Sequence, residues 1–255
     1  MNDRVVLVTG GLGGIGSAIA KRFAADGFRV ALNDVADDAT GNAAAEALGP
    51  ACGYFRGDLT AEDGPAAVVA AVKSRFGRLD VLVNNAGIQR VSPVVEFDTA
   101  DWGRVLALNL SAAFAATKAA LPGMTAAGWG RIINIASAHG LVASPFKAAY
   151  VAAKHGLVGF TKTVALEVAE MGVTANAICP GYVRTALVER QIEDSAAAHH
   201  MSREQVVRDV ILAAQPTRRF IEPEEVASLA AYLATDAARS ITGAAIAIDG
   251  GWTAR

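Results

Sequence analysis

Two side chains capable of acid–base chemistry stand four residues apart near the middle of the chain. Tyr150 and Lys154 fall in an Ala-rich stretch typical of a helix, where residues at i and i+4 share one face. An ammonium group beside a phenol favours the phenolate, which would make Tyr150 a base usable near neutral pH. Ser137 ends the preceding apolar run, and its hydroxyl could orient a substrate oxygen. The three residues predict a proton-transfer site, although Tyr-x-x-x-Lys pairs also arise by chance on helices.

A glycine-rich turn, GGLGGIG at residues 10–16, follows the first apolar run of the chain. Glycines let a backbone approach a pyrophosphate, and a helix that starts here adds free N–H groups and the positive end of its dipole. Two registers are open: Gly11, Gly13 and Gly16 fit G-x-G-x-x-G, whereas Gly10, Gly14 and Gly16 fit G-x-x-x-G-x-G. A tight turn without a ligand is the structural alternative, but the strand–turn–helix context favours a dinucleotide.

Asp34 ends the second predicted strand, about two dozen residues after the glycine turn. A carboxylate there can accept hydrogen bonds from the adenosine ribose and would repel a 2′-phosphate. The glycine turn holds no Arg or Lys that would attract that phosphate. The sequence therefore favours NAD over NADP, with an ordinary loop acid as the alternative for Asp34, since Asp37 and Asp38 follow closely.

Short Val/Ile/Leu runs alternate with longer Ala-rich stretches along the whole chain, a pattern typical of βαβ units. We expect an α/β fold, a doubly wound seven-stranded parallel sheet whose ligands bind at the carboxyl ends of the strands. Residues 1–255 are expected to form a single dinucleotide-binding and catalytic domain. The expected strands are Arg4–Thr9, Arg29–Leu32, Gly53–Phe55, Asp80–Asn84, Arg131–Ala136, Thr174–Cys179 and Ala245–Asp249. The expected helices are Gly14–Ala25, Asp38–Leu48, Pro65–Phe76, Thr99–Met124, Pro145–Met171 and Pro223–Ala234.

Residues 184–220 interrupt this alternation with a polar, helical pattern and no strand. A long insertion in a compact domain is usually functional, so we expect a helical substrate lid. A solvated pair of surface helices is the alternative. His199 and His200 lie in this segment without a cysteine or acid at ligand spacing, and we predict no metal site.

Composition excludes several classes of protein. Hydrophobic residues make up 53% of the 255 residues, enough to bury a large core and to exclude intrinsic disorder. The 23 basic and 25 acidic residues give a net charge of −2, which argues against nucleic-acid and membrane partners. Two cysteines cannot build a disulfide framework, so we expect a cytoplasmic protein.

Six short motifs of the chain match one enzyme family. They are Thr9-Gly10-x-x-x-Gly14-x-Gly16, Asn84-Asn85-Ala86-Gly87, Asn109, Ser137, Tyr150-x-x-x-Lys154 and Pro180-Gly181-x-x-x-Thr185. By these motifs the chain resembles the short-chain dehydrogenase/reductase family over essentially its full length. The resemblance selects the second glycine register and implies a Rossmann-type fold. It also implies a catalytic tetrad of Asn109, Ser137, Tyr150 and Lys154.

The same resemblance implies that NAD binds along the glycine turn and the neighbouring strand ends. Asp58 and Leu59 would contact the adenine, Lys154 the nicotinamide ribose, and Val183 with Thr185 the nicotinamide amide. The full set of implied cofactor-binding residues is Gly10, Leu12, Gly14, Ile15, Gly16, Asp34, Asp58, Leu59, Asn85, Gly87, Tyr150, Lys154, Val183 and Thr185.

Longer runs, such as NNAGIQ at 84–89 and GRIINIASAHGLVAS at 130–144, resemble one branch of the family, the D-3-hydroxybutyrate dehydrogenases. The resemblance implies reversible, NAD-dependent oxidation of (R)-3-hydroxybutyrate to acetoacetate. The carboxylate of this small hydroxy acid would be held by Gln89, His139, Lys147 and Gln191. A short-chain reductase acting on a 3-oxoacyl thioester or a sugar is the first alternative. A non-catalytic protein that senses nucleotide is the second.

The helix that carries Tyr150 has a predicted start at Ser144-Pro145, with Ser144 as N-cap and Pro145 at the first helical position. Lys147 would then share one face with Tyr150 and Lys154 at i, i+3 and i+7. The family resemblance further implies a homotetramer in which the helices Thr99–Met124 and Pro145–Met171 pack across a two-fold axis.

Overall fold

Seven parallel strands form one sheet in the computed structural model of the protein, which describes residues 3–185, 188–189, 192–193, 196 and 201–254. The strand order is β3-β2-β1-β4-β5-β6-β7, so the chain reverses its direction of winding between β1 and β4. This confirms the predicted doubly wound, Rossmann-type sheet, in which ligands bind beside such a reversal. The strands are β1 Val5–Thr9, β2 Arg29–Asp34, β3 Gly53–Arg56, β4 Val81–Asn84, β5 Gly130–Ile135, β6 Val173–Pro180 and β7 Ala245–Ile248.

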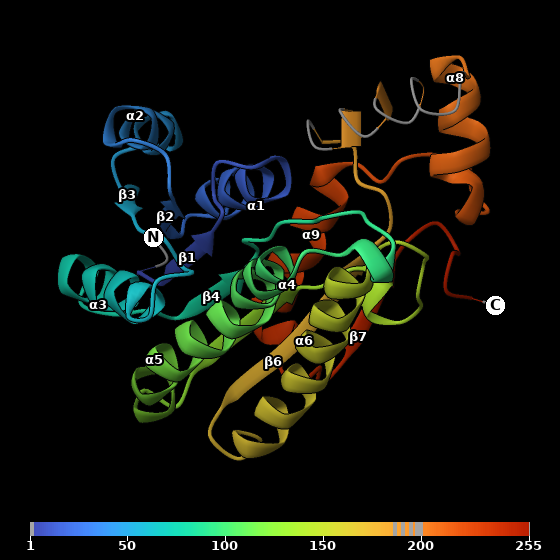
Figure 1. Cartoon of the computed structure of the whole chain (residues 1–255). Helices are drawn as coiled ribbons and strands as arrows, with labels where there is room; N and C mark the ends of the chain where they lie inside the picture. Colours follow the sequence, from blue (N-terminus) through green and yellow to red (C-terminus); the bar gives the residue numbers. More distant parts are fainter. Residues whose placement is uncertain (1–2, 186–187, 190–191, 194–195, 197–200, 255) are drawn as a thin grey trace.

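Helices cover both faces of the sheet (Figure 1). One face carries α1 Gly14–Ala25, α2 Asp38–Leu48 and α9 Pro223–Leu233. The other carries α3 Gly64–Phe76, α5 Ala112–Ala126 and α6 Ala148–Glu167. The bounds of α1 and α2 are those expected from the sequence, because glycines and a capping Asp37 mark the two starts.

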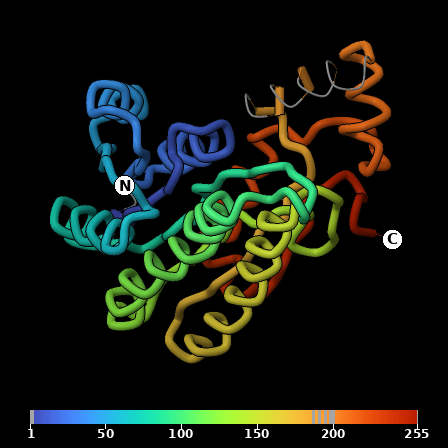
Figure 2. The backbone as a smooth tube through the Cα atoms, in the orientation of Figure 1, coloured from blue at the N-terminus to red at the C-terminus, as the bar shows by residue number. Residues whose placement is uncertain are grey.

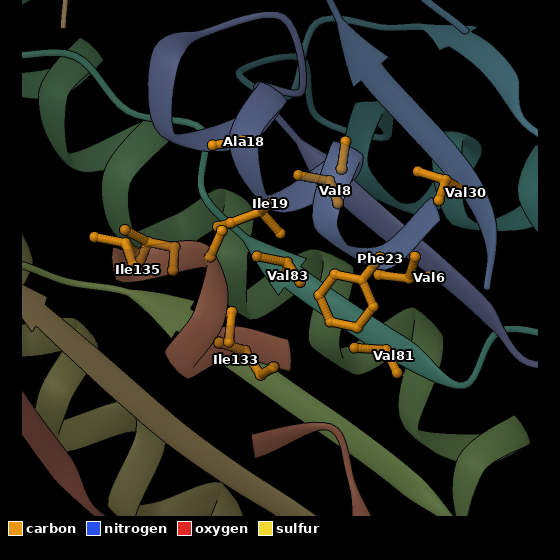
Figure 3. Close-up of a cluster of buried hydrophobic side chains, with 14 of the residues drawn as sticks. Val6, Val8, Ala18, Ile19, Phe23, Val30, Val81, Val83, Ile133 and Ile135 are labelled. Carbon is orange, nitrogen blue, oxygen red and sulfur yellow. The ribbon is translucent and has the colours of Figure 1, made fainter. Parts of the chain in front are cut away.

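Successive side chains of each strand point to opposite faces of the sheet, so each face is packed by alternate residues. Val6 and Val8 of β1 point to the side covered by α1, where Ile19 and Phe23 meet them (Figure 3). Val5 and Leu7 belong to the opposite core beneath α3, α5 and α6. Strands buried on both faces read as continuous apolar runs, which explains the VVLV sequence of β1.

One helical segment, Thr99–Ala126, is long and apolar enough by length and composition alone to cross a membrane, with a mean hydropathy of 1.4. It consists of α4 Thr99–Leu106, a π-helical stretch η2 Ala107–Ser111, and α5. In this fold it lies against the sheet and packs against α3 and α6. Its exposed side includes Phe114, which remains 51% exposed.

After β6 the chain leaves the sheet and reaches α8 Arg203–Val206, which lies apart from the sheet (Figure 2). A π-helical turn η4 Val207–Ile211 and a short η5 Leu212–Ala214 follow before the chain returns to α9. The described residues of this segment have a small apolar cluster of their own, with Val188, Ile192 and Val206 among its members. Within its described part, residues 203–214 are helical.

The start of α6 differs from the prediction. The helix begins at Ala148, with Lys147 as N-cap, rather than at Pro145. Phe146 has φ of 65°, a left-handed conformation that cannot continue into a right-handed helix. Residues 144–146 therefore form a turn that precedes the helix. Lys147 lies at the N-terminal boundary of α6 instead of within the first helical turn.

Candidate active site

A cavity of about 170 Å³ opens at the carboxyl ends of β4, β5 and β6. All four predicted catalytic residues line it, namely Asn109, Ser137, Tyr150 and Lys154. A longer cleft of about 570 Å³ adjoins it along the glycine turn. Asn85, Gly87 and Thr185 line both spaces, so they form the wall where the two meet.

Tyr150 and Lys154 project from α6 toward the same cavity, as their spacing predicts. The Lys154 ammonium is 5.5 Å from the centre of the Tyr150 ring and donates a hydrogen bond of 2.8 Å to the Ile135 carbonyl. Lys154 is only 4% exposed, and this burial lowers its pKa to about 8. The ammonium is therefore close to losing its proton near neutral pH.

The pKa of the Tyr150 phenol lies above its ordinary value, because burial disfavours the phenolate. A hydrogen bond with Ser137 acts in the opposite direction. The prediction that Lys154 sets this pKa below the ordinary value is wrong for this structure. Lys154 directs its ammonium at the Ile135 carbonyl, and the pKa of the phenol is set by its desolvation, by Ser137 and by Tyr182 instead.

Asn109 lies in the π-helical stretch between α4 and α5 and is 1% exposed. Its amide nitrogen donates to the carbonyls of Ile88 and Val105, both at 2.9 Å. Its amide oxygen is buried without a hydrogen-bond partner. A Cβ placed on Gly87 would lie 2.5 Å from that oxygen and 3.7 Å from the Lys154 nitrogen, so glycine is required between the two groups.

Ser137 follows β5 and caps the short helix η3 Ala138–Gly140. Its oxygen accepts a hydrogen bond of 3.1 Å from the backbone N–H of His139. The side chain is 8% exposed and faces the cavity beside Tyr150. The strand end and the cap together fix the position of this oxygen.

The His139 ring lies behind Ser137 and is 4% exposed. Its Nδ1 is 3.4 Å from the Ser137 hydroxyl oxygen, and its Nε2 is 2.9 Å from that of Ser144. Burial lowers the pKa of His139 to about 4, and the positive charge of Lys147 acts in the same direction. The imidazole is therefore neutral at physiological pH.

A second ammonium stands at the wall of the cavity. Lys147 donates a hydrogen bond of 3.2 Å to the Tyr182 hydroxyl, and its nitrogen is 5.2 Å from the centre of that ring. The Tyr182 ring stacks on Trp252 with 5.5 Å between ring centres and planes only 8° apart. Lys147 is thus held at the cavity by a rigid aromatic pair.

The adjoining cleft has the features that a dinucleotide pyrophosphate needs. Gly10 has φ of 61°, and a Cβ on Gly16 would collide with the Gly10 carbonyl, so both positions require glycine. The start of α1 carries no side-chain cap and no acidic residue in its first turn. Its N–H groups and dipole are therefore available to an anion, and the residues present fit the predicted cofactor.

Asp34 lies in this cleft at the end of β2. Its carboxylate accepts hydrogen bonds from the backbone N–H groups of Leu12, at 3.2 Å, and Val35, at 2.8 Å. The glycine turn thus fixes the acid at the place predicted to meet the adenosine ribose. Asp58 and Leu59 line the cleft farther along, and the Asp58 carboxylate accepts hydrogen bonds from the backbone and hydroxyl of Thr60.

Most predicted site residues line one of the two spaces. Gln89, His139, Lys147 and Val183 line the cavity, and Gly10, Gly14, Ile15 and Gly16 the cleft. Leu12 lines neither, because its side chain packs on the core and only its N–H reaches Asp34. Gln191 falls outside the described residues. Within the described part of the chain, no cluster of His, Cys, Asp or Glu could hold a metal ion.

The sequence analysis gave no site role to several residues that the structure places at these spaces. Trp252 and Tyr182 form one wall of the cavity, and Asn33 and Val35 line the cleft beside Asp34. Asn33 and Val35 flank Asp34 in the sequence, and this was the available signal that they line the cleft. Trp252 is about 100 residues away from Tyr150 and Lys154 in the sequence, so only the fold could place it at the cavity.

Comparisons with known proteins agree with this geometry. A family model described as enoyl-(acyl carrier protein) reductase matches residues 10–253. The chain is 52% identical to the D-beta-hydroxybutyrate dehydrogenase of Rhizobium meliloti (strain 1021), with 99% of each chain covered. It is 47% identical to the enzyme of that name from Cupriavidus necator, with 100% of each covered. An acetoacetyl-CoA reductase of Cupriavidus necator is 39% identical, with 98% of each covered. A solved structure of a variant of actinorhodin polyketide ketoreductase with NADPH superimposes with a TM-score of 0.92 at 37% identity, covering 99% of this chain and 98% of that one.

Proposed function

The chain belongs to the short-chain dehydrogenase/reductase family, and from this membership we propose that it oxidises (R)-3-hydroxybutyrate to acetoacetate reversibly with NAD. One observation carries the proposal: a single small cavity contains Ser137, Tyr150 and Lys154 together with the ammonium of Lys147. The first three residues serve a carbonyl–alcohol conversion. The fourth supplies a charge for a free carboxylate.

In the oxidation, Tyr150 takes the proton of the C3 hydroxyl while the C3–H bond breaks and the C3–O bond becomes a carbonyl. Ser137 donates a hydrogen bond to the same oxygen and holds it against Tyr150. Bound in the cleft, the oxidised nicotinamide ring would supply the hydride acceptor and a positive charge that favours the Tyr150 phenolate. The phenol needs that charge, since its own surroundings raise its pKa.

Lys154 and Asn109 carry the proton onward. The buried Asn109 oxygen lies close to the Lys154 ammonium across Gly87 and accepts no hydrogen bond from the protein. A water bound to this oxygen would connect Lys154 to solvent. A pKa of about 8 allows Lys154 to release and regain a proton near neutral pH.

NAD is the proposed cofactor because a carboxylate occupies the place where NADP would bring a phosphate. Asp34 is held by two backbone N–H groups and lines the cleft. A 2′-phosphate beside it would meet like charge, whereas a ribose diol can donate hydrogen bonds to it. The ketoreductase of similar fold was solved with NADPH, so the discrimination has to come from local residues such as Asp34.

Gln89, His139 and Lys147 form the described part of the proposed carboxylate site. The cavity volume of about 170 Å³ is below the roughly 300–1,000 Å³ typical of pockets for drug-sized ligands, which suits a four-carbon acid. Residues 184–220, which leave the sheet beside this cavity, are proposed to close over the substrate as a lid.

We also propose the predicted homotetramer. Phe114 of α5 and Phe160 of α6 make an edge-to-face contact, with 6.0 Å between ring centres. Phe114 is 51% exposed, and Leu166 of α6 is 80% exposed. Packing against a second subunit would cover this apolar surface.

A substrate panel tests the proposed function. Initial rates should be measured with 3-hydroxybutyrate, its methyl ester, and 3-hydroxybutyryl and longer 3-hydroxyacyl thioesters, each with NAD and with NADP. We expect the free acid with NAD to have the highest kcat/KM. A thioester used as well as the free acid would replace this proposal with a thioester reductase.

A further inference from the structure

We propose that Gln215 is a positioning residue for one wall of the substrate cavity: its buried side-chain amide fixes the backbone of Tyr182, and through Tyr182 it sets the place of the Lys147 ammonium. The proposal rests on the proposed function, in which Lys147 binds the substrate carboxylate. Gln215 is not among the residues that line the cavity, so it acts only through the residues that it holds.

The side chain of Gln215 joins the two ends of the segment at residues 184–220. Gln215 follows η5 directly and is fully buried. Its amide oxygen accepts a hydrogen bond from the backbone N–H of Tyr182, where the chain leaves β6. Its amide nitrogen donates a hydrogen bond of 2.7 Å to the backbone carbonyl of Arg219, where the chain returns toward α9. One amide therefore uses both its acceptor and a donor on main-chain groups that are far apart in the sequence.

The backbones of the two ends also meet, next to this amide. Val183 and Ile221 form a parallel bridge, and the N–H of Ile221 donates a hydrogen bond of 2.9 Å to the Tyr182 carbonyl. A Cβ on Gly181 would lie 2.4 Å from the Gln215 amide oxygen. Glycine is therefore required at position 181 for the amide to reach the Tyr182 N–H.

Tyr182 carries this constraint to the cavity. Its backbone N–H is held by Gln215 and its carbonyl by Ile221, so both of its main-chain hydrogen-bonding groups are fixed. Its ring then stacks on Trp252, and its hydroxyl accepts the hydrogen bond of 3.2 Å from Lys147. Without the amide, the Tyr182 N–H loses its partner, and a shift of Tyr182 toward another acceptor would move the Lys147 ammonium with it.

Asn176 makes the same kind of contact at a place remote from the cavity. It is buried in β6, where its amide nitrogen donates a hydrogen bond of 2.7 Å to the Ile241 carbonyl. Its amide oxygen accepts one of 3.1 Å from the Ala244 N–H. Asn176 and its two partners do not line the cavity. Because both amides bridge a backbone N–H and a backbone carbonyl, Asn176 separates a general loss of stability from a loss of positioning.

Kinetics of Gln215→Met, with Asn176→Leu as the matched control, test the proposal. Each variant replaces a buried amide by an apolar side chain of similar size, so both should unfold at a lower urea concentration than the parent protein. We expect Gln215→Met to raise KM for 3-hydroxybutyrate by about 2- to 12-fold, the range of one neutral hydrogen bond. Its Kd for ADP-ribose, a probe of the adenosine half of the cleft, should stay within twofold. Asn176→Leu should leave both constants within twofold.

Two further variants locate the effect. In a Lys147→Met background, Gln215→Met should change KM by less than twofold more, because its route to the substrate is already removed. Gln215→Glu keeps an oxygen for the Tyr182 N–H, so its KM should lie between those of the parent protein and Gln215→Met. A KM as high as that of Gln215→Met would place the effect at Arg219 and overturn the proposal. Equal changes in Gln215→Met and Asn176→Leu, or an ADP-ribose Kd that rises with KM, would overturn it as well.

Tryptophan fluorescence gives a result that does not depend on turnover. The signal of Trp252, obtained by difference from Trp252→Phe, reports its stacking on Tyr182. Acrylamide should quench this signal more in Gln215→Met than in the parent protein, and to the parent's extent in Asn176→Leu. Unchanged quenching in Gln215→Met would show that the amide does not hold Tyr182. Failure of the proposed function would appear separately, as a parent protein that uses the methyl ester as well as the free acid.

Discussion

Replacing Lys147 with Met removes the ammonium while keeping a side chain of similar length and apolar character. In the structure this ammonium stands at the cavity wall, 3.2 Å from the Tyr182 hydroxyl. An ammonium has three N–H donors, of which Tyr182 takes one. If Lys147 binds the substrate carboxylate, Lys147→Met should raise KM for 3-hydroxybutyrate and lower kcat somewhat, because the acid is then less well placed against Tyr150.

The size of the effect follows from the kind of contact that is lost. A hydrogen bond to a charged group is worth about 1.5–3 kcal/mol, which corresponds to roughly 10- to 150-fold in kcat/KM. The half-buried position of Lys147 reduces screening by water, and the stacked Tyr182–Trp252 pair limits its movement. Tyr182→Phe leaves the ammonium in place but removes its hydroxyl partner, so it should cost less than Lys147→Met.

The assay compares kcat/KM for the free acid with that for its methyl ester. The parent protein should prefer the acid strongly, and Lys147→Met should narrow the difference mainly by losing activity toward the acid. Lys162→Met is the matched control, since Lys162 lies on the exposed side of the same helix. Equal losses on acid and ester, or a parent protein that uses the ester as well as the acid, would refute the role of Lys147 as a carboxylate ligand.

Three further predictions concern the base, the cofactor and the buried imidazole. Tyr150→Phe should lower turnover about 10²–10⁴-fold with NADH affinity in a fluorescence titration nearly unchanged; turnover within a few-fold of the parent removes Tyr150 from its role. NAD should be strongly preferred over NADP in steady-state rates, and Asp34→Ser combined with Val35→Arg should narrow the gap; equal efficiency of the parent protein with both cofactors contradicts this. Folding lowers the pKa of His139 from 6.5 to about 4, so below pH 6.5 this residue binds more protons in the unfolded chain than in the folded protein. The free energy of unfolding should therefore fall by about 3 kcal/mol from this group alone as the pH is lowered from 6.5 to 4. Urea titrations at several pH values should find this part of the pH dependence missing in His139→Gln.

Prediction from the sequence succeeded where local chemistry alone decides the outcome. The strand–glycine–helix unit at residues 5–25 needs only an apolar run and a flexible turn, and its bounds agree with the structure. Tyr150 and Lys154 share one face of α6 because they are four residues apart. Both features depend on neighbours that are close in sequence, whereas the place of Asn109 in the same cavity was expected only from the family resemblance.

Other features required contacts between distant residues and could not be read from the sequence. Pro145 is a good first residue for a helix, but the left-handed Phe146, tied to the Ser92 loop, delays the start of α6. The pKa of Tyr150 depends on how deeply the fold buries the phenol, which no spacing rule contains. The same holds for Trp252, which reaches His139 and Tyr182 only in the folded chain.

The π-helical stretch Ala107–Ser111 separates the position of Asn109 from the packing of the helices on either side of it. A π-helical turn accommodates one residue more than an α-helical turn, and here that turn carries Asn109. Deleting one residue between 107 and 111 would restore a regular helix and leave α4 and α5 in their present rotation, because the π-helical turn absorbs the extra residue. α5 would still pack on α3, whereas Asn109 would lose the widened turn that holds it at Gly87. Over evolutionary time, such a deletion would therefore change the site while the fold persisted.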